Sequence, residues 1–147
     1  MLYYGLSNMN TDNQQKVPEP PVDIKNIPTI LIVEDDPVLL KMYSEKFKFE
    51  GFKVLSAPNG EDGLRLSLSE KIDMMLLDLM LPRLSGTELL TKLRSEANGK
   101  NTKVIVLTNL AEQDEKNKVM ALGALDYLIK AMQTPEEVVN KVKLHLR

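Results

Sequence analysis

The chain has 147 residues, a net charge of −2, one histidine and no cysteine. This length is typical of a single domain, and the near balance of 21 acidic and 19 basic residues gives no electrostatic reason to expect a nucleic-acid or membrane surface. The lack of cysteine excludes disulfides and zinc–thiolate sites, and the single histidine, His145, argues against a catalytic triad or a histidine-rich metal site.

Residues 1–28 differ in composition from the rest of the chain. They hold four of the eight prolines, among asparagine, glutamine, aspartate and lysine. Such a segment has too little apolar surface to offset the entropy lost on ordering. We therefore expect a disordered N-terminal arm at residues 1–28 and a folded domain at residues 29–147. A short docking peptide is the alternative interpretation of the arm.

From Thr29 onward, short apolar runs alternate with amphipathic stretches. The first run, ILIV, precedes a helix for which Asp36-Pro37 provides an N-cap and first turn and Gly51 a stop. A weaker strand at Val54-Leu55 leads through Asn59-Gly60 into a second helix. The pattern so far indicates two consecutive β-α units.

Three further β-α units follow. The run MMLL at 74–77 precedes the capping box Ser85-Gly86-Thr87-Glu88, and the run VIVL at 104–107 precedes a polar helix. The last run, at 127–129, is followed by a helix that begins at Thr134-Pro135. Five β-α units in succession predict an α/β fold in which helices cover both faces of a doubly wound parallel sheet. Three methionines are assigned to core packing (Met74, Met75 and Met120), and His145 is interpreted as an exposed terminal residue.

Polar residues capable of phosphoryl chemistry follow four of the predicted strands, namely Glu34-Asp35-Asp36, Asp78, Thr108 and Lys130. The carboxyl ends of parallel strands share one edge of the sheet, so we expect these residues to form one pocket. Crowded carboxylates repel one another unless a cation lies among them, and all-oxygen ligation suits Mg²⁺. A carboxylate can accept a phosphoryl group, while a lysine and a threonine can contact its oxygens.

Four segments together resemble the receiver domain of two-component response regulators: ILIVEDDPVLL at 30–40, MMLLDLMLPRLSG at 74–86, VIVLTNL at 104–110 and LGALDYLIK at 122–130. The resemblance covers residues 29–147, and the order and spacing of the four motifs make it specific. It implies a flavodoxin-like, five-stranded parallel sheet of order 2-1-3-4-5 that is flanked by five helices.

The resemblance also implies a role for individual residues. Asp78 resembles the phosphoacceptor. Glu34 and Asp35 resemble the acidic pair that holds Mg²⁺, with Asp35 as the better candidate for direct ligation, and Met80 resembles the residue whose backbone carbonyl joins them. Asp36 is expected to cap the first helix instead.

Three further residues complete the implied site. Lys130 resembles the lysine that contacts phosphate, Thr108 the switch hydroxyl and Tyr127 the aromatic switch. Tyr127 could also be a core tyrosine with a solvent-facing hydroxyl, an alternative that the sequence leaves open.

Two positions depart from the family pattern. Lys130 is followed by Ala131, where proline, often in a cis peptide, is usual. A cis bond without proline costs about 2.5–4 kcal/mol, so we expect a trans peptide here. Asn109 follows Thr108, where a smaller residue is more usual.

The implied function is that of a phosphorylation-activated signalling switch rather than an enzyme. A sensor histidine kinase or a histidine phosphotransfer protein would donate the phosphoryl group, and an unknown downstream protein would read the phosphorylated state, without an output domain. We expect a cytoplasmic monomer, with dimerisation of the phosphorylated form left open. No apolar run reaches the roughly 18 residues of a membrane span.

Three other functions fit the sequence less well. A phosphatase working through an aspartyl phosphate would typically have an acid two residues after Asp78, where Met80 stands. A receiver that no longer accepts phosphate is disfavoured by the intact set of polar strand ends. A transcription factor is disfavoured because no helix-turn-helix or basic region is left to assign.

Overall fold

The computed structural model describes residues 26–147. They form one parallel sheet of order β2-β1-β3-β4-β5, which confirms the expected order 2-1-3-4-5. The strands are β1 Thr29–Val33, β2 Lys53–Ala57, β3 Met74–Leu77, β4 Val104–Thr108 and β5 Asp126–Ile129.

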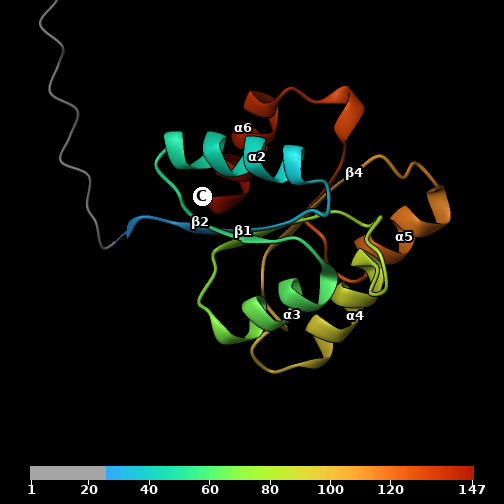
Figure 1. The fold of residues 1–147 in the computed structure, drawn as a ribbon. Coiled ribbons are helices and arrows are strands. Elements are labelled where there is room, and N and C mark those ends of the chain that lie inside the picture. Colours follow the sequence, from blue (N-terminus) through green and yellow to red (C-terminus); the bar gives the residue numbers. More distant parts are fainter. Residues whose placement is uncertain (1–25) are drawn as a thin grey trace, which may run out of the picture.

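Five α-helices cover the two faces of this sheet (Figure 1). Helices α2 and α6 lie on one face, and α3, α4 and α5 lie on the other (Figure 1). Their bounds are α2 Pro37–Phe49, α3 Gly60–Ser69, α4 Gly86–Ser95, α5 Gln113–Ala121 and α6 Pro135–Leu146. A short 3₁₀ turn, η2 Lys130–Met132, connects β5 to α6 and was not predicted from the sequence.

The helices begin at the caps that the sequence indicates. The Asp36 carboxylate accepts hydrogen bonds from the backbone of Val38 and Leu39 at the start of α2. Side chains of three further residues cap α3, α4 and α6 in the same manner: Asn59, Ser85 and Thr134. Each oxygen satisfies an N–H group that a helix would otherwise leave unpaired.

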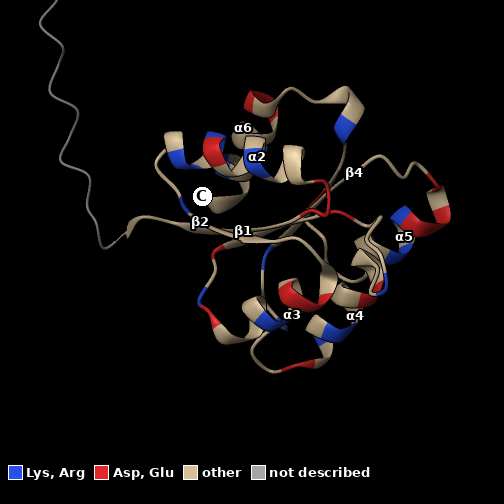
Figure 2. Cartoon of the chain, viewed as in Figure 1, with Lys and Arg blue, Asp and Glu red and all other residues tan. Residues whose placement is uncertain are grey.

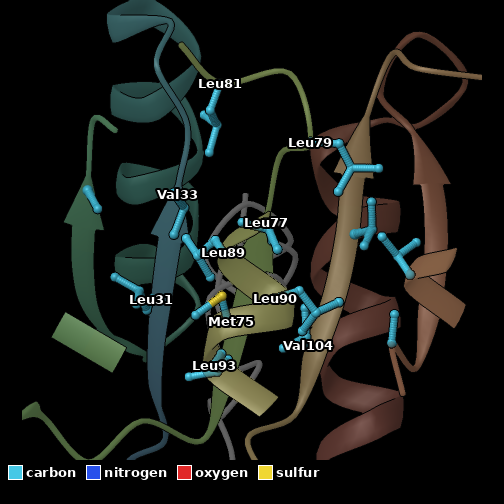
Figure 3. Close-up of a cluster of buried hydrophobic side chains, with 14 of the residues drawn as sticks. Leu31, Val33, Met75, Leu77, Leu79, Leu81, Leu89, Leu90, Leu93 and Val104 are labelled. Atoms are coloured by element: carbon cyan, nitrogen blue, oxygen red, sulfur yellow. The ribbon is translucent and has the colours of Figure 1, made fainter. Parts of the chain in front are cut away.

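The alternation of side chains along the strands divides the core into two layers. One layer lies under α3 and α4 and includes Leu31, Val33, Met75 and Leu77 (Figure 3). The other lies under α2 and α6 and contains the neighbouring strand residues, which are Ile30, Ile32, Met74 and Leu76. Residues 30–33 of β1 and all of β3 are buried on both faces, and these residues are apolar without exception.

Two expectations about single residues were wrong. Met120 was assigned to the core, but it is 40% exposed on α5, where Val119 is the buried residue. His145 was interpreted as an exposed residue, yet its ring lies 3.3 Å from the Asp126 carboxylate and its side chain is only 25% exposed. Both errors arise because α5 is predominantly polar and α6 packs its end against β5.

Residues 1–25 of the expected arm lie outside the described residues. Within the described part, the Pro28 carbonyl accepts a hydrogen bond at 3.0 Å from the backbone N–H of Lys53, the first residue of the edge strand β2. Pro28 is therefore already hydrogen bonded to the sheet. No helix in residues 26–147 has both the length and the apolar character that a membrane span needs.

Candidate functional site

The register of the two central strands fixes the position of the acidic residues. Val33 pairs with Leu77, so Glu34 and Asp78 follow directly at adjacent strand ends. The backbone N–H of Asp78 donates to the carbonyl of Val33 at 3.1 Å, and that of Glu34 donates to Ala57 at 3.1 Å. The sheet itself therefore holds both acidic residues in place.

Three carboxylates meet at this edge, as expected. Glu34, Asp35 and Asp78 each offer an oxygen, and these oxygens lie within 4.8 Å of one another. Glu34 and Asp78 are buried, with 3% and 4% exposure, whereas Asp35 is exposed. Figure 2 shows acidic residues in the loop between β1 and α2, which carries Glu34 and Asp35, whereas Asp78 follows β3.

Lys130 completes the cluster from β5, on the far side of β4. Its Nζ donates to Asp78 Oδ2 at 2.7 Å and forms a second short ion pair with Glu34. The lysine side chain is 11% exposed. Three carboxylates and one ammonium leave the cluster with surplus negative charge.

Burial, aided by the Asp78 carboxylate and opposed by Lys130, raises the pKa of Glu34 to about 7. Burial alone would lower the pKa of Lys130, but its hydrogen bonds to Asp78 and Glu34 outweigh this effect and leave the pKa raised. Both directions follow from a low-dielectric site in which charges interact strongly.

The cluster fits a divalent cation with oxygen ligands. Glu34 Oε2 is buried and has no hydrogen-bond partner, which is costly unless another group satisfies it. Glu34, Asp78 and Lys130 also line a small cavity together with Tyr43 and apolar strand residues. An unpaired oxygen, surplus negative charge and a donor set without nitrogen or sulfur all suit Mg²⁺.

Met80 contacts the site through a group that the sequence did not indicate. Its backbone N–H donates to Asp78 Oδ1 at 3.1 Å, while Lys130 occupies Oδ2. Both oxygens of Asp78 are thus held. The Met80 side chain is 57% exposed beside the site, and ligation by its carbonyl stays a prediction.

Thr108 and Tyr127 are joined to each other through Leu110. The buried Thr108 hydroxyl accepts a hydrogen bond from the Leu110 N–H at 3.2 Å. The Tyr127 hydroxyl donates to the carbonyl of the same residue. Tyr127 is half-buried, and Lys116 Nζ lies 5.6 Å from the centre of its ring.

Gly86 is a further site residue, although the sequence indicated only a capping role. A Cβ atom at this position would lie 2.2 Å from the carbonyl oxygen of Asp78 and 2.7 Å from the Cα of Leu79. The start of α4 therefore packs directly on the backbone of Asp78, and only glycine allows that approach.

The expected trans peptide at Ala131 is confirmed, since residues 26–147 contain no cis peptide bond. The two departures from the family pattern lie side by side, because the Asn109 side chain accepts a hydrogen bond from the Ala131 N–H at 3.0 Å. Nothing in the sequence predicted this contact except the coincidence of two unusual residues.

Comparisons with known proteins agree with this geometry. Residues 30–143 match the response regulator receiver domain. The transcriptional regulatory protein SrrA of Staphylococcus aureus is 40% identical over 121 residues, which are 80% of this chain and 47% of SrrA. The chain thus spans about half the length of the curated relatives it matches.

Solved structures give the same result. A CheY-like response regulator receiver domain protein from Methanospirillum hungatei is 31% identical with a TM-score of 0.76, covering 82% of this chain and 94% of that one. The receiver domain of the Francisella response regulator 1452 is 29% identical with a TM-score of 0.74, covering 81% and 96%.

Proposed function

The chain belongs to the response regulator receiver family, and from this premise we propose that Asp78 is its phosphoacceptor. The observation that supports this role most strongly is the buried Asp78 carboxylate, hydrogen bonded to Lys130 at 2.7 Å within a cluster of surplus negative charge. A carboxylate held in this way is oriented for attack but still needs a cation to approach a phosphorylated donor.

Mg²⁺ is the proposed cofactor, and Asp35, Asp78, Glu34 and the backbone carbonyl of Met80 would hold it. When bound, it would neutralise the negative charge that carboxylates and phosphoryl oxygens bring together. The unpaired Glu34 Oε2 and the three convergent acidic residues support this assignment.

In the proposed reaction, an Asp78 oxygen attacks the phosphorus of a phosphohistidine on a sensor histidine kinase or a histidine phosphotransfer protein. The oxygen–phosphorus bond forms as the phosphorus–nitrogen bond breaks, and the electron pair returns to the donor imidazole, which takes a proton from water. Lys130 lies in contact with Asp78 and can neutralise charge on the transferred group.

Thr108 and Tyr127 are proposed to report the phosphorylated state. The Thr108 oxygen already accepts the Leu110 N–H, so the hydroxyl proton is available to a phosphoryl oxygen. Movement of Thr108 toward that oxygen would act on Leu110 and through its carbonyl on Tyr127. We propose that a downstream protein reads this change by direct contact; transcriptional regulation is a property named for SrrA.

The test is labelling with acetyl phosphate and Mg²⁺, followed by intact-mass measurement. The parent should gain the mass of one phosphoryl group, and Asp78→Asn or an excess of EDTA should abolish the gain. Asp114→Asn on the exposed surface of α5 is the matched control and should label like the parent. Labelling of Asp78→Asn at the parental rate would refute the proposal.

A further inference from the structure

One hydrogen bond connects the segments that follow β4 and β5. Asn109 Oδ1 accepts from the backbone N–H of Ala131 at 3.0 Å, although the two residues are 22 positions apart. Each partner is the immediate neighbour of a site residue, because Asn109 follows Thr108 and Ala131 follows Lys130. The bond therefore ties the backbone beside the lysine to the end of the neighbouring strand.

The chemistry of this bond requires both residue types. Alanine or glycine at position 109 would offer no side-chain acceptor, and proline at position 131 would offer no N–H. The two departures from the family pattern are thus the two halves of one interaction.

The local structure explains why an acceptor is needed here. Ala131 lies in the 3₁₀ turn Lys130–Met132, and the early N–H groups of a helical turn have no partner within the turn. At the end of the turn, the Gln133 N–H donates to the Lys130 carbonyl at 3.3 Å. Asn109 satisfies the Ala131 N–H and so fixes the orientation of the turn.

We propose that Asn109 is a positioning residue for Lys130, an inference that rests on the proposed phosphoryl transfer to Asp78. Lys130 reaches Glu34 and Asp78 from the first residue of a turn whose other residues, Ala131 and Met132, are exposed. The Asn109 side chain supplies the restraint that keeps the Lys130 ammonium directed at the carboxylates.

The first experiment uses the unphosphorylated chain and NMR. Asn109→Ala should make the Ala131 amide exchange with solvent about tenfold faster, because an exposed N–H loses its acceptor. The ¹⁵Nζ signal of Lys130, visible only while its ion pairs slow proton exchange, should broaden. Asn140→Ala on the exposed face of α6 is the matched control and should change neither signal.

The second experiment measures the rate of labelling by acetyl phosphate with Mg²⁺. Asn109→Ala should slow it about three- to tenfold, as expected when a group that contacts the transferred phosphoryl is less well oriented. The thermal midpoint should stay within a few degrees of the parent, since the bond lies at the surface. In the Ala131→Pro background, where no N–H exists, Asn109→Ala should change the rate by less than about twofold.

The outcomes separate the two proposals. If the parent does not label at Asp78, the proposed function fails, and the Ala131 and Lys130 signals still decide whether Asn109 positions the lysine. Unchanged signals in Asn109→Ala overturn the positioning role. The positioning role is also overturned if Asn109→Ala slows labelling equally in the parent and in the Ala131→Pro background. Asn109 would then act through a contact other than the Ala131 N–H.

Discussion

Two partly buried cations, Arg94 and Lys130, hold distant segments of this molecule together, and their surroundings differ. Arg94 on α4 donates to the backbone carbonyls of Leu122, Gly99 and Thr102 at 2.7, 3.0 and 2.7 Å. Lys130 pairs instead with the carboxylates of Asp78 and Glu34. One cation is surrounded by neutral acceptors and the other by excess negative charge.

The difference distinguishes a structural contact from a functional site. Around Arg94, the fixed carbonyls compensate the burial that lowers the pKa of its guanidinium. Around Lys130, a buried oxygen of Glu34 stays without a partner and the carboxylates outnumber the ammonium. The Arg94 corner is therefore electrostatically complete, whereas the Lys130 cluster needs a further cation.

Removal of Arg94 should give the largest effect on stability. Arg94→Met would leave several backbone carbonyls of the α4–β4 and α5–β5 connections unpaired, so we expect the free energy of unfolding to fall by about 2–4 kcal/mol. Urea denaturation measures it. Arg65→Met, whose side chain is 65% exposed, is the control and should cost less than about 0.5 kcal/mol.

The rate of phosphorylation shows whether Arg94 also contributes to the site. At a temperature where Arg94→Met is folded, its rate of labelling at Asp78 should equal that of the parent, because the arginine does not contact the cluster. A large loss of labelling rate in the folded variant would contradict the structural assignment of the Arg94 corner.

Removing a negative charge from the cluster should raise the free energy of unfolding, whereas removing Arg94 should lower it. Glu34→Gln removes a buried carboxylate that costs the fold stability when ionised, so the metal-free variant should be more stable than the parent by about 1–2 kcal/mol at pH 8. Mg²⁺ should then stabilise the parent more than the variant. Glu45→Gln, with a side chain 67% exposed, is the control.

The pH dependence follows from the raised pKa of Glu34. Because this pKa rises from 4.5 in the unfolded chain to about 7, the folded state binds the extra proton between these values. The contribution of Glu34 to stability is therefore lost as pH rises from about 4.5 to 7. The advantage of Glu34→Gln should shrink as pH falls from 8 to 5, and an advantage that grows instead would contradict the account.

The smallest effect concerns the lifetime of the acyl phosphate. Met80 is 57% exposed and Leu110 is half-buried, and neither side chain can position an attacking water. Met80→Asn with Leu110→Glu should speed phosphate release severalfold, or by about 1 kcal/mol in barrier height. Release of phosphate from pre-labelled protein measures it, with Met120→Asn and Leu144→Glu as the control pair.

A double mutant that releases phosphate no faster than the parent would mean that positions 80 and 110 do not gate the water. Decay of the parent within seconds would lead to the same conclusion.

Much of the fold could be predicted because its signals are local. Continuous apolar runs mark β1, β3 and β4 as strands buried on both faces, and Asp36, Ser85 and Thr134 mark helix starts by their own side chains. The acidic cluster was predictable as well, since the carboxyl ends of parallel strands must share one edge.

Contacts to the backbone could not be predicted in this way. Every residue has a backbone carbonyl, and every residue except proline has a backbone N–H. Residue type therefore does not reveal that the carbonyls around Arg94, or the N–H groups of Met80 and Ala131, will meet a side chain. From the sequence, Gly86 is likewise only a member of a capping box. Its close approach to the Asp78 carbonyl is visible only in the structure.

If the surplus negative charge around Lys130 serves phosphoryl transfer to Asp78, the acyl phosphate must form at that residue. Borohydride reduction of the labelled protein converts an aspartyl phosphate to homoserine, and tryptic fragments then locate it. The account predicts homoserine at position 78, in the peptide 72–83, and only when Mg²⁺ was present during labelling. Homoserine at Asp73 of the same peptide, or reduction at Glu34 or Asp35 in the peptide 26–41, would contradict it.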